Sequence, residues 1–521
     1  MCVSADMEQT AKQPKRKKEI DLTSGNLFVK ILYVSFPLML SGVLQLLYNT
    51  ADLVVCGKFG SEHAVGAISA TLALINLIIN LFLGLSVGAS VLVSRHYGRR
   101  DIEACERITH TAMLLSPILG LVVGALGIAI SRSCLKLMGI SPLLFDLSAG
   151  YLMIYFAGLP FSMVYNFGSA LMRATGDTRR PFFILMCAGV VNVLLNLLFV
   201  IVFKLDVNGV ATATVISQGI SACAVVIFLK RNNSYIHLSF KRLRICRDEL
   251  VGIIKIGVPA GAQGVIFSLS NVLLQSSINS LGNAFGEYIN DGSGAAQSLE
   301  AYVYTCMNAV SQTCVAFVSA NYGIGNFDNI KKSIGYSCII VSAYGLIVGG
   351  LMALCGKPLL GMYTSDAQAI KEGYGRLIVV CLPYLLCGLM ETVASSIRGM
   401  GKSLLPAIVT CVGVCGIRIV WIYAAFPAAR FHSLQGLLIS YPLSWTVTII
   451  IHLICLFSQW NNFKSCTLTP VAEAAAITAE SAADDESDTR ATDGVDVFPT
   501  ADTPPADTPS STESVNATIA E

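Results

Sequence analysis

Residues 173–181 read RATGDTRRP and residues 398–406 read RGMGKSLLP, with Arg, Gly and Pro at matching positions. The offset between the two stretches is constant, since 398 − 173 = 401 − 176 = 406 − 181 = 225. VSRHYG at residue 93 and VSANYG at residue 318 have the same offset. Ordered motifs at one offset predict two homologous halves. Pseudo-symmetric halves of this kind are typical of transporters that work at the interface between two helical bundles.

The composition is that of a membrane protein. Hydrophobic residues make up 54% of the 521 residues, charged residues only 13%, and the mean hydropathy is +0.66. The apolar runs are continuous rather than alternating, and each is long enough to cross the bilayer as a helix of about 20 residues. We therefore expect an all-α membrane protein with about 12 transmembrane helices in two pseudo-symmetric six-helix lobes. The expected spans are 30–56, 66–93, 108–131, 145–171, 182–203, 209–229, 252–280, 296–319, 335–356, 372–397, 404–426 and 436–458.

Lys and Arg gather on alternate loops, which predicts both termini in the cytoplasm of a multi-pass protein of the cell membrane. The expected domains are a basic N-terminal segment (1–26), a first lobe (27–231), a cytoplasmic linker (232–250), a second lobe (251–462) and a disordered cytoplasmic tail (463–521). The polar linker stretch RLRICRDE (242–249) is expected to form a surface helix. The tail is rich in Ala, Ser, Thr, Pro, Asp and Glu, a composition that does not build a core.

The 17 cysteines form no CxxC pair and mostly lie inside the expected spans, so we interpret them as small packing residues. The polar, basic start of the chain precedes an apolar run too long for a signal peptide. We expect a monomer in the lipid bilayer, with a small-molecule substrate, no cofactor and no nucleic-acid partner.

Asp52 is the clearest candidate for a functional residue, because an ionisable group inside a span is costly. It lies on the first span with Gln45, Tyr48 and Asn49, at spacings that put these side chains on one helical face. A lone carboxylate beside amide and phenol groups suits a proton or a small hard cation such as Na⁺. The alternative is that Asp52 caps or hydrates the helix near the outer interface.

Further amide and hydroxyl groups are concentrated in the first six spans. Asn192 and Asn196 are one turn apart on the fifth span, Asn166 lies on the fourth and Thr214 on the sixth. Each could also serve as a polar contact between packed helices. Their concentration near Asp52 favours a binding site.

The second half carries a different set of intramembrane charges. Glu300, Arg376, Glu391 and Arg418 lie within its spans. Arg418 requires an acidic partner or water at membrane depth, and Glu300 and Glu391 are the acidic candidates. The cluster of Glu300, Glu391 and Arg418 is either a structural ion pair or a second coupling site.

With these residues, the chain resembles the multidrug and toxic compound extrusion (MATE) family over roughly residues 20–460. The resemblance depends on FP…LQLLYNTADLVVCGKFG, FGSALMRATGDTRRP, VVNVLLNLLFVIVF, SIRGMGKSLLP and the repeated VSxxYG. It implies a central cavity open to each side in turn and export of amphipathic, often cationic, drugs in exchange for Na⁺ or H⁺. Family members place an acid on the first helix and an asparagine and a second acid on the fifth.

Asp52 matches the first of these acids and Asn192 the asparagine, whereas Asn196 replaces the second acid. Tyr48, Asn166 and Thr214 fall where supporting groups are expected. The resemblance therefore implies a cation site of six residues in the first lobe, with Na⁺ at Asp52 as one option. We expect the substrate cavity to include aromatic, methionine and amide side chains, namely Gln45, Asn49, Phe161, Met163 and Tyr165.

Three alternatives to a drug antiporter remain. A lipid-linked saccharide or lipid flippase of the same superfamily would require a strongly cationic cavity, and the spans carry few arginines. A channel or receptor would not need two repeated lobes. An intramembrane enzyme is disfavoured because the sequence has no HExxH motif and no clustered catalytic acids on matched helices.

Overall fold

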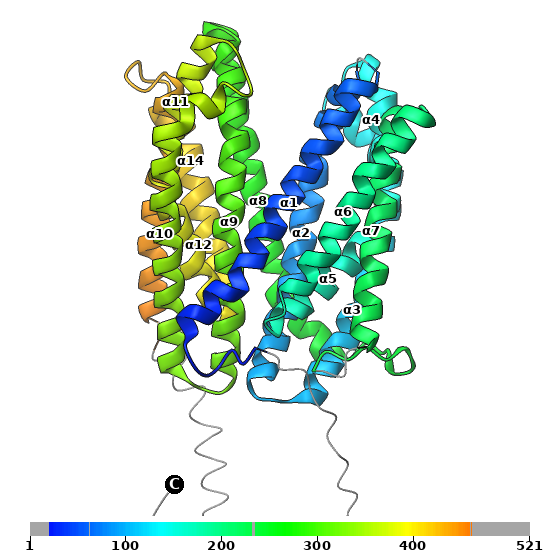
Figure 1. The fold of residues 1–521 in the computed structure, drawn as a ribbon. Coiled ribbons are helices and arrows are strands. Elements are labelled where there is room, and N and C mark those ends of the chain that lie inside the picture. The colour runs from blue at the N-terminus through cyan, green and yellow to red at the C-terminus, as the bar shows by residue number, and fades with distance from the viewer. Residues whose placement is uncertain (1–19, 62, 232–234, 459, 461–521) are drawn as a thin grey trace, which may run out of the picture. The chain divides into compact units, whose positions relative to one another are not determined.

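The computed structural model describes residues 20–61, 63–231, 235–458 and 460, and these residues contain helices and no strands. The first half comprises α1 (Leu27–Phe59), α2 (Ala64–Gly98), α3 (Ile102–Leu137), α4 (Pro142–Ala157), α5 (Leu159–Ala174), α6 (Arg179–Leu197), the π-helix η1 (Leu198–Val202) and α7 (Asp206–Arg231). Figure 1 shows these helices beside those of the second half. The expected tail, 463–521, and most of the expected N-terminal segment lie outside the described residues.

The second half repeats this order. It comprises a short 3₁₀ turn η2 (Phe240–Arg242), α8 (Arg247–Phe285), α9 (Tyr288–Gly323), α10 (Phe327–Leu360), α11 (Ala367–Cys381), α12 (Tyr384–Gly399), α13 (Leu404–Thr410), η3 (Cys411–Gly416), α14 (Ile417–Val420), η4 (Trp421–Ala425), α15 (Leu434–Leu438) and the span Leu434–Ser458 that α15 begins.

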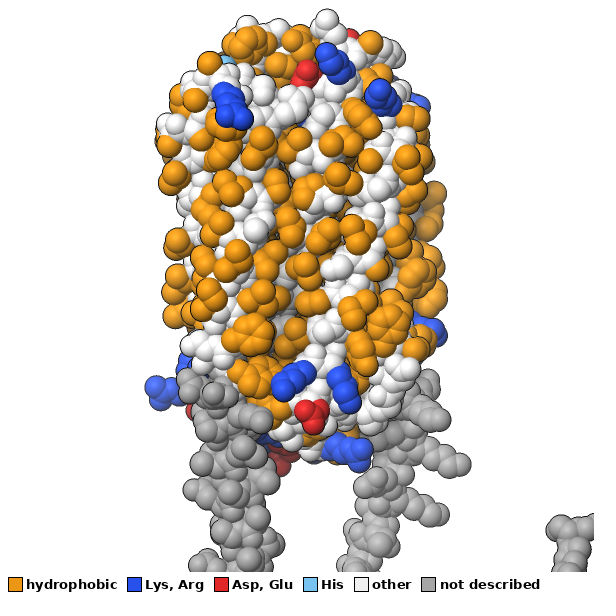
Figure 2. All heavy atoms as spheres, turned by 90° about the vertical axis from the view of Figure 1, so that its left-hand side faces the viewer, with side chains coloured by type: hydrophobic (Ala, Val, Ile, Leu, Met, Phe, Trp, Pro, Cys, Tyr) orange, Lys and Arg blue, Asp and Glu red, His pale blue; other side chains and the backbone are white. Residues whose placement is uncertain are grey.

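The helices can cross a membrane by length and composition. In the described part of the chain, nine are long and apolar enough, and two bent pairs raise the count to eleven. The helix α9, with 36 residues, is long enough to be a twelfth span but does not meet the same apolar criterion. With α9 the arrangement of helices agrees with the predicted two sets of six. Figure 2 shows apolar side chains over the middle of one face, with most Lys and Arg toward its two ends. This distribution is expected of a surface in contact with lipid.

Equivalent details recur in both halves and explain the repeated motifs. The α4–α5 pair bends by 49° beside Leu159–Pro160, and α11–α12 bends by 41° beside Leu382–Pro383. Proline removes a helical hydrogen bond, so both bends have the same cause. Gly176 and Gly401 both have positive φ, 83° and 89°, where a side chain would be strained. Gly176 and Gly401 occupy the same position in the two motifs, just after the end of α5 and of α12.

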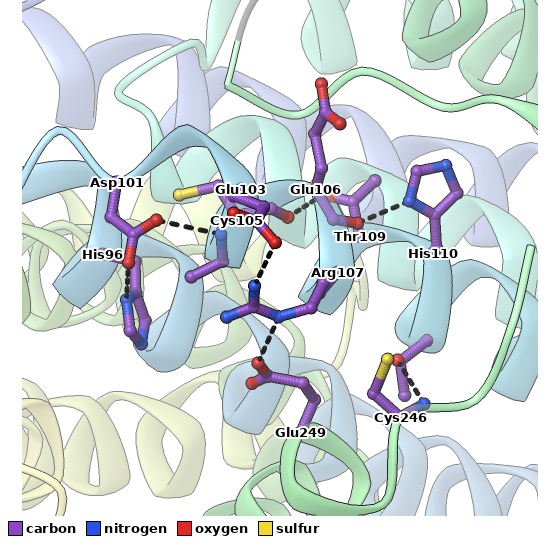
Figure 3. Close-up of polar contacts among 12 residues, drawn as sticks. His96, Asp101, Glu103, Cys105, Glu106, Arg107, Thr109, His110, Cys246 and Glu249 are labelled. Carbon is purple, nitrogen blue, oxygen red and sulfur yellow. Dashed lines mark hydrogen bonds and ion pairs between the residues drawn. The ribbon is translucent and has the colours of Figure 1, made fainter. Parts of the chain in front are cut away.

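The linker between the halves is held against the start of α3 (Figure 3). The Ser239 amide donates to His110 Nε2 at 3.0 Å, and the Cys246 amide donates to Thr111 Oγ1 at 3.1 Å. Arg107 Nε donates to Glu249 Oε1 at 3.4 Å. The surface helix expected at 242–249 is wrong, because only η2 precedes α8 and α8 begins at Arg247. The backbone amides of Ser239 and Cys246 in the linker instead donate hydrogen bonds to side chains of α3.

α1 is shared between the halves. Its early part packs against α9 and α10 of the second half, and α1 also packs against α6 and α7 of the first. Pro37 lies inside α1 without ending it. A shift of α1 would therefore change its packing against both lobes.

The two halves contact each other through their backbones at the ends of α2 and α9. Two repeated glycines allow the backbones to approach this closely. A Cβ on Gly98 would overlap the carbonyl oxygen of Ala320, and a Cβ on Gly323 would overlap that of Arg95. These contacts are symmetric, since 98 + 225 = 323 and 95 + 225 = 320. Arg99 Nε also donates to the Gly323 carbonyl at 2.6 Å. The VSxxYG motif thus lets the two lobes touch at the ends of α2 and α9.

Gly98→Val is therefore expected to open this contact. Forcing a side chain against a fixed backbone costs about 1–3 kcal/mol, which corresponds to a shift of roughly 5–150-fold in a two-state population. Electron spin resonance distances between labels at the exposed residues Arg100 and Asp328 should lengthen. Gly335→Val is the matched control, because no atom lies within 4 Å of a Cβ there. Unchanged distances in Gly98→Val would contradict this role for the glycine.

Candidate functional site

Asp52 lies in the second half of α1 with its side chain buried between helices, at 8% exposure. Asn196 on α6 donates from Nδ2 to Asp52 Oδ1 at 2.5 Å. Thr214 Oγ1 on α7 lies 3.5 Å from Asp52 Oδ2, the outer limit of a hydrogen bond. Asp52 forms no ion pair within the described residues. Its carboxylate is therefore held by neutral groups from two other helices.

Asn192 forms a second layer behind these contacts. Its Nδ2 donates to Thr214 Oγ1 at 3.4 Å, and its Oδ1 accepts from Asn196 Nδ2 at 3.3 Å. The Asn196 Oδ1 atom is buried and has no hydrogen-bond partner. An unpaired buried carbonyl oxygen beside a carboxylate is an unsatisfied acceptor. A cation or an acidic proton placed there would satisfy it.

The oxygen-rich donor set fits a hard monovalent cation or a proton. Carboxylate, amide and hydroxyl oxygens are the ligands that such cations prefer. Within the described residues, no three His, Cys, Asp or Glu side chains lie together, so the site lacks the ligand set of a transition metal.

Two tyrosines of α4 were missed by the sequence analysis. Tyr151 and Tyr155 are 5% and 8% exposed, and both lie close to Asp52. Their rings stack with centroids 6.4 Å apart. The only sequence signal was their spacing of four residues, which puts them on one helical face. That face could not be aligned with Asp52 before the fold was known.

Two of the six expected cation-site residues make other contacts. Tyr48 donates to the carbonyl oxygens of Leu185 and Met186 on α6, at 3.1 and 3.3 Å, and its ring packs against Gly189. Asn166 donates to Ser162 Oγ at 3.4 Å within α5. Neither has a hydrogen bond to Asp52. The structure groups Asp52, Asn192, Asn196 and Thr214, and it leaves Tyr48 and Asn166 outside that group.

The expected cavity residues are dispersed. Gln45 and Asn49 are exposed on α1, and Phe161 is 43% exposed at the start of α5. Tyr165 is partly buried and its hydroxyl lies 3.5 Å from the Pro181 carbonyl oxygen. Met163 is completely buried in the hydrophobic core, so its assignment to a cavity lining is wrong. Its apolar side chain packs between helices. Helix periodicity alone could not show whether this side chain would face a cavity or a neighbouring helix.

The charges of the second half are arranged differently from the expected cluster. Glu300 on α9 binds Arg376 on α11 through two hydrogen bonds of 2.8 Å, and both side chains are buried. Arg418 on α14 has neither acid within ion-pair distance. It donates to Asn271 Oδ1 at 3.1 Å and lies 4.0 Å from the Tyr441 ring centroid. The prediction that Glu300 or Glu391 pairs with Arg418 is wrong, because Arg376 occupies Glu300 and the hydrogen-bond partners of Arg418 among the described residues are neutral. The Nη2 atom of Arg418 is buried and has no hydrogen-bond partner.

Removing one partner of the Glu300–Arg376 pair should destabilise the fold. Glu300→Ala leaves an uncompensated buried guanidinium, which typically costs about 3–5 kcal/mol. Denaturant unfolding of the purified protein in detergent measures this loss. The double variant Glu300→Leu/Arg376→Met removes both charges and should recover most of the stability. A single variant as stable as the wild type would show that the pair is not structural.

The chain was compared with known proteins. The MatE family model matches residues 37–198 and 259–424, one match in each half. The probable multidrug resistance protein YoeA of Bacillus subtilis (strain 168) is 25% identical over 425 residues, covering 80% of this chain and 90% of the relative. The multidrug export protein MepA of Staphylococcus saprophyticus is 22% identical over 443 residues, covering 82% and 96%.

Solved structures share the fold. The outward-facing structure of a multidrug resistance MATE family transporter of the MOP superfamily superposes with a TM-score of 0.79, at 20% identity, covering 87% of this chain and all of that one. A MOP superfamily transporter from Pyrococcus furiosus superposes with a TM-score of 0.79 at 21% identity, covering 86% and 99%. The chain therefore belongs to the MATE family of multidrug efflux transporters and is a membrane transporter rather than an enzyme.

Proposed function

We propose that this protein is a secondary antiporter that exports amphipathic, cationic drugs or metabolites in exchange for Na⁺ or H⁺ entering at Asp52. The observation that carries the proposal is the buried Asp52 carboxylate, whose partners among the described residues are all neutral. A carboxylate at membrane depth is costly unless a cation or proton neutralises it. The names of the multidrug relatives support the substrate class.

The basic loops support an orientation for this conformation. Arg99, Arg100 and Lys402 lie in the turns that follow α2 and α12, at the end of the helices where the halves touch. Basic loops are retained in the cytoplasm, so we infer that the contact closes the cytoplasmic side. Asp52 lies beyond the middle of α1 from that end and would be approached from outside.

Coupling then follows from the position of α1. An ion at Asp52 joins α1 to α6 and α7, while the early part of α1 packs on α9 and α10. Neutralising Asp52 would tighten the first of these contacts and change how α1 sits on the second lobe. Gln45 and Asn49, exposed on the same helix, are candidates to contact the drug before the ion displaces it. A potential of 100 mV supplies about 2.3 kcal/mol for each charge that crosses.

Asp52→Asn should abolish ion-driven export, because an amide carries no negative charge that an entering ion could neutralise. The measurement is uphill movement of a fluorescent organic cation in liposomes, under a sodium gradient and a pH gradient imposed separately. Asp146→Asn is the control, since that carboxylate is 85% exposed beside Arg132. Full gradient-driven transport by Asp52→Asn would sink the proposal, and loss in both variants would indicate a general defect.

Asn196→Ala should weaken coupling without abolishing it. It removes the 2.5 Å hydrogen bond to Asp52 and the unpaired oxygen beside it, and a bond to a charged group contributes about 1.5–3 kcal/mol. The ion concentration that gives half-maximal transport should rise roughly 10–100-fold. Asn166→Ala, which lies outside the group, should leave that concentration unchanged. An unaltered ion dependence in Asn196→Ala would remove this residue from the site.

A further inference from the structure

Arg173 and Arg398, the arginines that open the two repeated motifs, line one small cavity between the lobes. Arg173 comes from α5 and Arg398 from α12, at the offset of 225. The cavity volume is about 30 Å³. Ser90, Gln312 and Thr313 supply the rest of its polar lining. None of the described residues that line it carries a carboxylate.

The two guanidinium groups are poorly compensated. Arg173 donates from Nη1 to Ser169 Oγ at 3.1 Å, and Arg398 donates from Nη2 to Gln263 Oε1 at 3.1 Å. Arg398 Nε is buried and has no hydrogen-bond partner. Neither arginine forms an ion pair within the part of the chain that the structure describes. Glu391, two turns earlier on α12, acts on Arg398 electrostatically, which leaves two cations against one nearby acid.

We propose that this cavity binds one monatomic anion of the size of chloride, bridging Arg173 and Arg398. Two like charges facing one enclosed space repel each other, and an anion between them turns that repulsion into attraction. A volume of about 30 Å³ suits a halide or one or two waters and is small for a nucleotide or a drug. Guanidinium N–H groups supply the donors that an anion requires.

The site exists only while the lobes touch, because each lobe contributes one arginine. An anion that binds this arrangement alone stabilises it by mass action. Chloride therefore favours the conformation closed at this end and opposes its opening. This inference does not depend on the ion or substrate of the proposed antiport.

The first test compares purified protein in sodium chloride and in sodium gluconate at equal ionic strength. If chloride binds with a dissociation constant of about 10 mM, 100 mM chloride raises the folded-to-unfolded ratio about elevenfold. The unfolding midpoint should rise accordingly in the wild type and in Arg179→Gln, whose guanidinium instead covers the Tyr33 ring at 4.2 Å. Arg173→Gln and Arg398→Gln should lose the chloride dependence. An equal shift in all four proteins, or none in the wild type, would overturn the site.

The second test keeps the proposal decidable if the arginine variants do not fold. Crystals of the wild type grown in sodium bromide should show anomalous scattering between the two guanidinium groups. Density without an anomalous signal there would mean that water alone fills the cavity, and the proposal would then be wrong.

Discussion

An uncompensated carboxylate inside a membrane protein requires a cation, and the arrangement around Asp52 follows from that constraint. Two other helices, α6 and α7, contribute neutral groups to it rather than a basic residue. Neutral partners hold the carboxylate in place but leave its charge available to a mobile ion. A lysine or arginine at Asn196 would have neutralised Asp52 permanently. The site thus combines fixed geometry with an exchangeable charge.

The second lobe solves the same problem in the opposite way. Arg418 is a fixed cation on the repeat-equivalent helix, and Asn271, the counterpart of Asn49 at an offset of 222, accepts one of its hydrogen bonds. The Tyr441 ring faces its guanidinium. This lobe therefore carries a fixed positive charge, which disfavours binding of a cation beside it. The two lobes share a scaffold and differ in chemistry, which is consistent with ion coupling through the first lobe.

The sequence predicted the architecture well because repetition and hydropathy are local signals. The offset of 225 predicted two lobes, and it also relates the helix caps Asp101 and Asn326. The bends beside Pro160 and Pro383 recur at a nearly equal offset of 223, since 383 − 160 = 223. Partners between distant helices could not be predicted in the same way. Tyr48 lies one turn from Asp52 but donates its hydrogen bond to a backbone carbonyl of α6. Glu300 pairs with Arg376 and not with Arg418, and Tyr151 of α4 lies close to Asp52. Which faces meet depends on helix rotation and packing.

The central claim is that an ion at Asp52 controls the contact between the lobes through α1. The direct measurement is the distribution of spin-label distances between Met138 and Met362, both exposed at the ends of α3 and α10 away from that contact. A cysteine-free background with labels at these two positions allows Na⁺ or pH to be varied alone. The account predicts that one of these ions shifts the distribution in the wild type and leaves Asp52→Asn unchanged. The same shift in both proteins would contradict it.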